Sequence, residues 1–153
     1  MFSKHVSCNG DLVCKLSLYF INATSLAKPN ALQLLSTDII SNSTHVALVV
    51  ETWFHDSVPD DQILLANYTL VRLDRNPAQK RKGGGICFYV RNDVQTTVIK
   101  HRNVKEPNLE YMWIRCEFDS VIYVIACIYH PPPGRVMIVL CLCVNCRLTW
   151  TSC

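Results

Sequence analysis

The amino-acid sequence predicts an α/β domain with a mixed sheet, and three patterns support this fold class. Apolar residues recur at helical spacing after Pro29, a residue that fits the first turn of a helix. The continuous apolar run Val46–Val50 is typical of a strand covered on both faces. Apolar and polar residues alternate in Ile86–Arg91 and in residues 111–118. One helix followed by hairpins around buried strands is an α/β arrangement.

The first third of the chain is expected to fold as strand, helix and strand. Residues 15–21 are expected to form a strand, and residues 30–40 a helix with Leu32, Leu35 and Ile39 at helical spacing. The apolar run described above follows. It is the first of two strands expected to be covered on both faces, the second being the near-continuous apolar run at residues 121–129.

Five strands are expected in the rest of the chain, at residues 68–73, 86–91, 94–99, 111–118 and 121–129. The strand at 94–99 is expected to pair with the strand before it, across a turn at Asn92 and Asp93. A second turn at Asp119 and Ser120 joins the last two strands into a hairpin. Three consecutive glycines at residues 83–85 indicate a tight turn, since no Lys-Ser/Thr follows them as in a phosphate-binding loop.

Composition places the chain among globular proteins of one domain. It has 153 residues, half of them apolar and 18% charged. No apolar run approaches the ~20 residues that a membrane-spanning helix needs, so we expect no membrane association. The polar residues near the start do not resemble a signal peptide, and we expect an intracellular protein, nuclear or cytoplasmic, that is not secreted.

Nine cysteines are scattered rather than arranged as a disulfide framework. Cys87, Cys116 and Cys127 fall inside expected strands and are best interpreted as buried free thiols. Four more lie close together near the end of the sequence, where structural zinc is an alternative. Only Cys143 and Cys146 have the required spacing, so this alternative is weak.

The middle of the chain is basic. Residues 72–105 contain nine Lys or Arg and two Asp. Such a segment indicates a polyanion as partner, although a solvated loop explains the charge equally well.

The junction at Glu51 is the most informative point of the sequence. This carboxylate directly follows the buried run and precedes Thr52 and Trp53, where it needs a cation, a hydrogen-bond partner or solvent. Other motifs flank it in order: FINATSL at 20–26, RLDRN at 72–76, the three glycines at 83–85 and YHPPP at 129–133. Together they resemble the apurinic-type endonuclease domain of non-LTR (LINE-type) retrotransposons. That domain belongs to the endonuclease/exonuclease/phosphatase superfamily, with the DNase I-like fold.

The resemblance implies roles for three residues and a partner. Glu51 is similar to the metal-binding glutamate of the family, whose ion is Mg²⁺. Asn22 is similar to the asparagine beside it, and Tyr129 to the tyrosine that contacts the phosphate. DNA is the implied partner, with candidate contacts at Arg72, Arg75, Lys80, Arg81 and Lys82. Alternatives stay open: Glu51 as an exposed strand-end acid, Asn22 as a turn residue, and Tyr129 as a core aromatic bonded to a backbone carbonyl.

The resemblance covers only part of the family's domain. We assign residues 15–135 to a partial endonuclease/exonuclease/phosphatase domain, leave 1–14 unassigned, and set 136–153 apart as a Cys-rich hydrophobic tail. The family's later Gly-Asp-Phe-Asn and Ser-Asp-His motifs do not occur in these residues. The expected fold is therefore the N-terminal part of a DNase I-like two-sheet α/β sandwich, truncated. Its buried strands are expected to lack part of their cover, which predicts a poorly soluble or molten chain.

The expected function follows from the same resemblance. The chain is interpreted as a fragment of a Mg²⁺-dependent retrotransposon DNA endonuclease that is inactive alone. One alternative is a non-catalytic nucleic-acid-binding remnant. Another is a phosphatase-type member of the same superfamily.

Overall fold

The computed structural model describes residues 3–6, 16–75, 83–101, 109–130 and 136–143. In this part of the chain the elements are, in order, β1 (Ser3–Val6), β2 (Leu18–Asn22), α1 (Ala31–Ser41), β3 (Val46–Val50), the 3₁₀ turn η1 (Asp60–Gln62), β4 (Tyr68–Leu73), β5 (Ile86–Arg91), β6 (Gln95–His101), β7 (Glu110–Phe118), β8 (Val121–His130) and β9 (Val136–Cys143).

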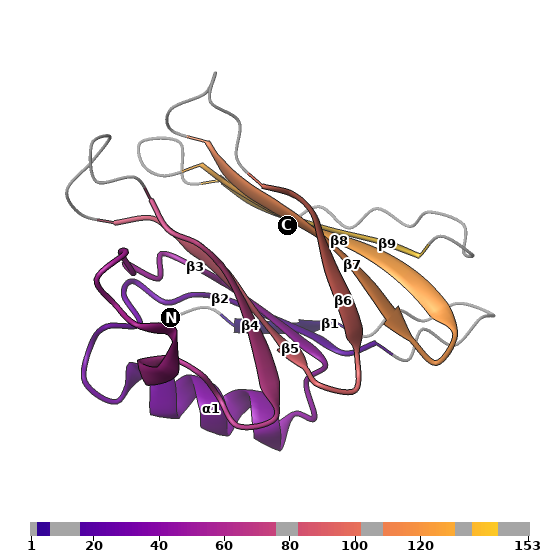
Figure 1. The fold of residues 1–153 in the computed structure, drawn as a ribbon, viewed down its shortest axis with the longest axis horizontal. Helices are drawn as coiled ribbons and strands as arrows, with labels where there is room; N and C mark the ends of the chain where they lie inside the picture. The colour runs from indigo at the N-terminus through magenta and orange to yellow at the C-terminus, as the bar shows by residue number, and fades with distance from the viewer. Residues whose placement is uncertain (1–2, 7–15, 76–82, 102–108, 131–135, 144–153) are drawn as a thin grey trace.

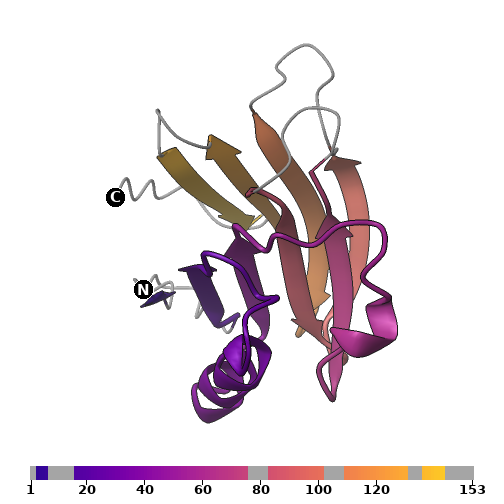
Figure 2. The ribbon, with the colours of Figure 1, turned by 90° about the vertical axis from the view of Figure 1, so that its left-hand side faces the viewer.

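These strands form two sheets. The first has the strand order β1-β2-β3-β5-β4, in which β2 and β3 are parallel and the other neighbours antiparallel. The second is an antiparallel meander of order β6-β7-β8-β9. The sheets lie face to face, and α1 lies on the outer side of the first sheet (Figures 1 and 2). The α/β class and the two-sheet sandwich predicted from the sequence are confirmed.

Two apolar clusters hold these layers together. The inner cluster fills the space between the sheets with side chains such as Leu48, Phe88, Ile114 and Ile125, all fully buried. The outer cluster packs α1, through residues such as Ile39, against the other face of the first sheet. Burying this much apolar surface is the main favourable contribution to folding.

Most elements form where the sequence predicted them. The strands β4 and β5 have the predicted bounds, and α1 lies one residue from its expected position. The turn of β7 and β8 falls at Asp119 and Ser120, which both adopt positive φ (50° and 62°). These angles suit a two-residue hairpin turn.

The predicted pairing of residues 94–99 with β5 is wrong. The strand β6 pairs instead with β7, in the second sheet. Because β5 lies between β3 and β4, both of its edges are already occupied. The chain therefore turns after Arg91, and Val94 enters the inner cluster between the sheets.

The expectation of uncovered strands is wrong for β3, whereas β8 is only partly covered and its outward residues, such as Ile128, are half-buried. Every residue of β3 is fully buried, with the second sheet on one side and α1 on the other. Part of the segment set apart as a tail forms β9, which pairs with β8 and places Val139, Cys141 and Cys143 against the inner cluster. The cover of β3 and of the inner face of β8 thus comes from the chain itself, and the predicted poorly soluble or molten state stays a prediction.

The cysteine interpretation is confirmed for the described strands. Cys87, Cys116 and Cys127 are buried free thiols. Burial raises the pKa of each thiol, to about 11 for Cys116 and about 12 for Cys127. Among the described residues, no helix has the length and apolar composition needed to cross a membrane.

Candidate active site

Glu51 lies at an edge of the first sheet where two strands end together. Because β2 and β3 are parallel, their carboxyl ends meet there, and Asn22 is in register with Val50. The pairing continues past both strands, with Ser25 N–H donating to the Glu51 carbonyl at 2.7 Å. Glu51 itself adopts a positive φ of 58°, an uncommon conformation for a residue other than glycine. Backbone of this kind concentrates at functional sites.

Three donors hold the Glu51 carboxylate. The Tyr129 hydroxyl donates to Oε1 at 2.5 Å, while the Trp53 indole N–H (2.6 Å) and the Gly84 backbone N–H (3.0 Å) both donate to Oε2. Burial by itself raises the pKa of Glu51, but these hydrogen bonds and the charge of Arg75 outweigh it and lower that pKa. The carboxylate is therefore ionised at neutral pH. Its Oε1 accepts one hydrogen bond here and has capacity for a second partner.

Tyr129 connects the two sheets. It lies near the end of β8 and is only 3% exposed, yet its hydroxyl reaches the carboxylate at the edge of the opposite sheet. Burial and the hydrogen bond to Glu51 both raise the pKa of Tyr129, so the hydroxyl stays protonated and donates. The alternative of a core tyrosine bonded to a backbone carbonyl does not describe this contact.

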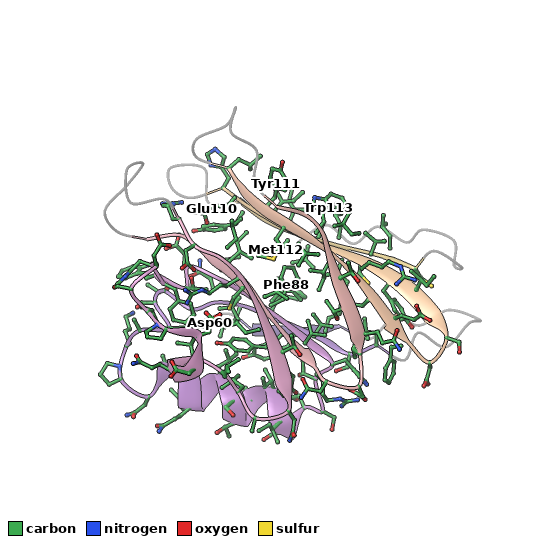
Figure 3. The ribbon with its side chains drawn as sticks, viewed as in Figure 1. Asp60, Phe88, Glu110, Tyr111, Met112 and Trp113 are labelled. Atoms are coloured by element: carbon green, nitrogen blue, oxygen red, sulfur yellow. The ribbon has the colours of Figure 1, made fainter. Side chains whose placement is uncertain are left out.

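A second buried acid, Glu110, was missed by the sequence analysis. It opens β7, is in register with Tyr129, and is 8% exposed. Its Oε1 accepts from Arg75 Nε at 2.6 Å and its Oε2 from the Gly85 N–H at 2.9 Å. Burial raises the pKa of Glu110 despite the adjacent guanidinium. Figure 3 shows Glu110 on the strand that also carries Met112, which lies beside Phe88.

The glycines at 83–85 form the turn that joins these groups. All three adopt positive φ (88°, 80° and 86°), as the predicted tight turn requires. A Cβ on Gly84 would collide with Arg75 and Glu110, and one on Gly85 with the Thr52 hydroxyl. Only glycine fits such a close approach. The adjacent N–H groups of Gly84 and Gly85 then donate to two different carboxylates, those of Glu51 and Glu110.

The remaining predicted residues lie around this centre. The Asn22 side chain is exposed, and its Oδ1 accepts from the Thr24 N–H (3.1 Å) and hydroxyl (3.3 Å), which is the turn arrangement left open above. Arg72 donates to the Val58 carbonyl and pairs with Asp60 and Asp74. Arg75 is committed to Glu110, with its side chain 8% exposed. The other three basic candidates, Lys80, Arg81 and Lys82, lie outside the described residues.

The residues present fit a weakly held magnesium ion. In the described ranges no three His, Cys, Asp or Glu side chains are grouped to enclose a metal. Mg²⁺ nevertheless often uses one or two carboxylates and keeps several waters. Ionised Glu51, with acceptor capacity left on Oε1, meets that minimum. For the zinc alternative only Cys141 and Cys143 are described, since Cys146 and Cys153 fall outside.

Comparison with known proteins supports the fold. No family model and no curated protein sequence matches the chain. Among solved structures, it is similar to a humanized form of TDP2 from D. rerio carrying 14 mutations, at a TM-score of 0.55 and 12% sequence identity. The match covers 78% of this chain and 52% of the TDP2 chain, so the chain spans about half the length of that structure. At this identity the likeness shows the fold alone: the chain has a DNase I-like fold.

Proposed function

We propose that the chain is part of a Mg²⁺-dependent DNA endonuclease domain of the retrotransposon type, which hydrolyses phosphodiester bonds. The observation that carries this proposal is the contact of Tyr129 with Glu51. These residues are 78 positions apart and belong to different sheets, yet they share one hydrogen bond at a common edge. Two motifs that the resemblance linked to catalysis thus meet in a fold that the resemblance also implied.

The chemistry required is the cleavage of a charged ester. A hard cation on the phosphate, such as Mg²⁺, would neutralise charge and orient water when bound. Glu51 is the residue suited to hold that cation, because its carboxylate is ionised and fixed by three donors. The Tyr129 hydroxyl keeps its single proton, which could be donated to a phosphate oxygen at the same place in exchange for its bond to Glu51. Asn22 lies at the same edge through the register of β2 with β3.

The 153 residues hold only part of the catalytic set. The family motifs that supply the water-orienting aspartate and the aspartate-histidine pair do not occur among them. Losing one member of such a set commonly costs ~10²–10⁴-fold in rate, and the effects of several losses are not additive. We therefore expect the 153-residue chain to leave supercoiled plasmid intact in Mg²⁺, with Glu51→Ala and Tyr129→Phe making no measurable difference.

A chimera tests the proposal directly. The second half of an intact endonuclease of this family is joined to this chain, and nicking of supercoiled plasmid is measured in Mg²⁺. We expect nicking to be restored and Glu51→Ala to reduce it by at least ~10²-fold. Glu117→Ala is the matched control, since Glu117 is paired with Arg115 at the surface away from this edge. A chimera that folds and nicks equally well without Glu51 would refute the role of this carboxylate.

The basic segment supports a second candidate, a nucleic-acid-binding function without catalysis. Arg72, Arg75 and Arg91 are all engaged in ion pairs within the protein. The cations left for DNA would then include residues 80–82. We expect binding without sequence preference, with affinity that falls as salt rises by a log–log slope of about −0.9 per phosphate neutralised. Replacing these three residues by Ala should flatten the slope in fluorescence anisotropy, and an unchanged slope would place the contact elsewhere.

A further inference from the structure

Two carboxylates from different sheets are held by adjacent backbone amides. Gly84 N–H donates to Glu51, which follows β3, and Gly85 N–H donates to Glu110 of β7. The two N–H groups belong to successive planar peptide units that meet at the Gly84 Cα. The second unit, Gly84–Gly85, is held at both ends, because its N–H donates to Glu110 and its carbonyl accepts from the Trp53 N–H at 3.0 Å. A displacement of Glu110 is therefore expected to shift this peptide unit and the residues bonded to it, Gly84 and Trp53, which supply the two donors to Oε2 of Glu51.

Arg75 adds a second connection between the same groups. Its guanidinium bonds Glu110 at 2.6 Å, with both side chains about nine-tenths buried. It also lies beside Gly84, where an added Cβ would strike both members of the pair. Arg75 and Glu110 thus both pack against Gly84, and Glu110 also accepts a hydrogen bond from the Gly85 N–H. The charge of Arg75 further favours the ionised form of Glu51.

Glu110 occupies an inward-facing position of β7. Its strand neighbours of the same parity, Met112 and Ile114, belong to the apolar inner cluster. A buried acid at such a position is costly for stability, and its ion pair regains only part of that cost. Stability alone is therefore a poor explanation for this residue. Its hydrogen bond with the Gly85 N–H connects it, through the neighbouring Gly84, to the Glu51 carboxylate.

We infer that Glu110 is a positioning residue, which fixes the Glu51 carboxylate toward Tyr129 through the Gly84–Gly85 peptide and Arg75. The inference deepens the function proposed above and rests on it for the identity of the bound ion. The positioning itself is a property of the metal-free protein. Partners of this kind around a metal ligand are commonly worth ~10–100-fold in metal affinity.

The test compares two Gln variants of the same strand. Glu110→Gln keeps the shape of the side chain and removes its charge. Glu117→Gln makes the same change in a half-exposed ion pair with Arg115. Amide spectra of the metal-free 153-residue chain are recorded first, and Tb³⁺ is then titrated with luminescence sensitised by Trp53, whose indole contacts Glu51.

We expect Glu110→Gln to move the Gly84 amide signal, although Gly84 does not contact Glu110 by a hydrogen bond, and to weaken Tb³⁺ binding ~10-fold or more. Glu117→Gln should change neither. A folded Glu110→Gln variant with the Gly84 signal unmoved would overturn the inference. If Gly84 moves but the wild-type chain binds no Tb³⁺, the positioning stands and the proposed metal role fails.

The reciprocal variant covers the case in which Glu110→Gln does not fold. Glu51 lies at the sheet edge and is partly exposed, so Glu51→Gln is expected to fold. Coupling between two sites acts in both directions. Glu51→Gln should therefore move the Nε–H signal of Arg75, which donates to Glu110, and leave that of Arg115 in place. An unmoved Arg75 signal would also overturn the inference.

Discussion

The outer faces of the two sheets differ in how completely the chain covers them. On the first sheet, the outward residues of β3 and β5, such as Val49 and Tyr89, are fully buried beneath α1 and the loop before β4. On the second sheet, outward residues of β7 and β8 such as Trp113 and Ile128 are only half-buried, and Ile138 of β9 is 43% exposed. Figure 2 shows α1 beside the first sheet and no helix of the described residues against the second.

The described residues therefore complete the interior between the sheets but cover the outer face of the second sheet only in part. The interior between the sheets is closed, and the edge with Glu51 and Tyr129 depends on that interior. The outer face of the second sheet is apolar but only partly covered by the described residues. The match covers 52% of the TDP2 chain, and the rest of that chain has no counterpart in the match. Equal substitutions on the two outer faces should therefore have unequal effects.

The largest expected effect is in the helix that covers the first sheet. Ile39→Ala removes a fully buried side chain and should lower the free energy of unfolding by about 2–5 kcal/mol. Ile128→Ala removes a half-buried side chain from the second sheet and should cost about 1 kcal/mol, because this side chain buries less apolar surface on folding than Ile39 does. Urea denaturation followed by circular dichroism measures both. Equal losses would mean that the outer face of the second sheet is better covered than the described residues show.

A smaller effect is expected in the pH dependence of stability, which should differ between the two site acids, Glu51 and Glu110. The pKa of Glu51 is lowered from 4.5, so its contribution to stability is present above that value and is lost as pH falls through the folded pKa. The pKa of Glu110 is raised from 4.5, so its contribution is present below that value and is lost as pH rises through the folded pKa.

The two Gln variants therefore should show opposite pH trends. The stability difference between Glu51→Gln and the wild type should shrink as pH falls. The stability difference between Glu110→Gln and the wild type should shrink as pH rises above 4.5. Thermal melts in EDTA between about pH 3 and 7 measure the difference. Parallel trends for the two variants would show that one of these shifts has the wrong sign.

The smallest effect is expected at the exposed edge of the second sheet. Ile138→Lys places a charge on a side chain that is already 43% exposed, and the stability change should stay within about 0.5 kcal/mol. The same variant should bind less of an apolar-surface dye such as ANS, because it interrupts the half-covered face. Unchanged dye binding would move the exposed apolar surface to another part of the molecule.

The sequence predicted those features that depend on local pattern. The buried run before Glu51 and the alternation in β5 and β7 predicted their strands correctly, because the spacing of apolar residues along a strand depends on whether one or both of its faces are buried. The partner of β6 was not predictable in this way, since it depends on which strand edges are already occupied. Glu110 left one usable signal: an acid with the same parity as Met112 and Ile114 on an alternating strand.

The site residues show the same limit. The family resemblance pointed to Glu51 and Tyr129 but did not predict the hydrogen bond between them, which arises only when the sheets pack. The roles of these two residues, of Asn22 and of the basic residues stay predictions. The positive φ values at 83–85 were foreseeable from three consecutive glycines, whereas the two carboxylates that their N–H groups bind come from distant strands.

The meander of the second sheet has a consequence for the order of folding. The strands β7 and β8 are joined by a two-residue turn, and a hairpin of this kind closes in ~1–10 μs. The first sheet instead needs the pairing of β3 with β5, separated by the whole of β4 and its loops, and such non-local contacts form slowly. Glu110 and Tyr129 are register partners within the early hairpin. We expect this half of the site to be assembled first, as a template onto which the glycine turn and Glu51 dock in a later, slower step.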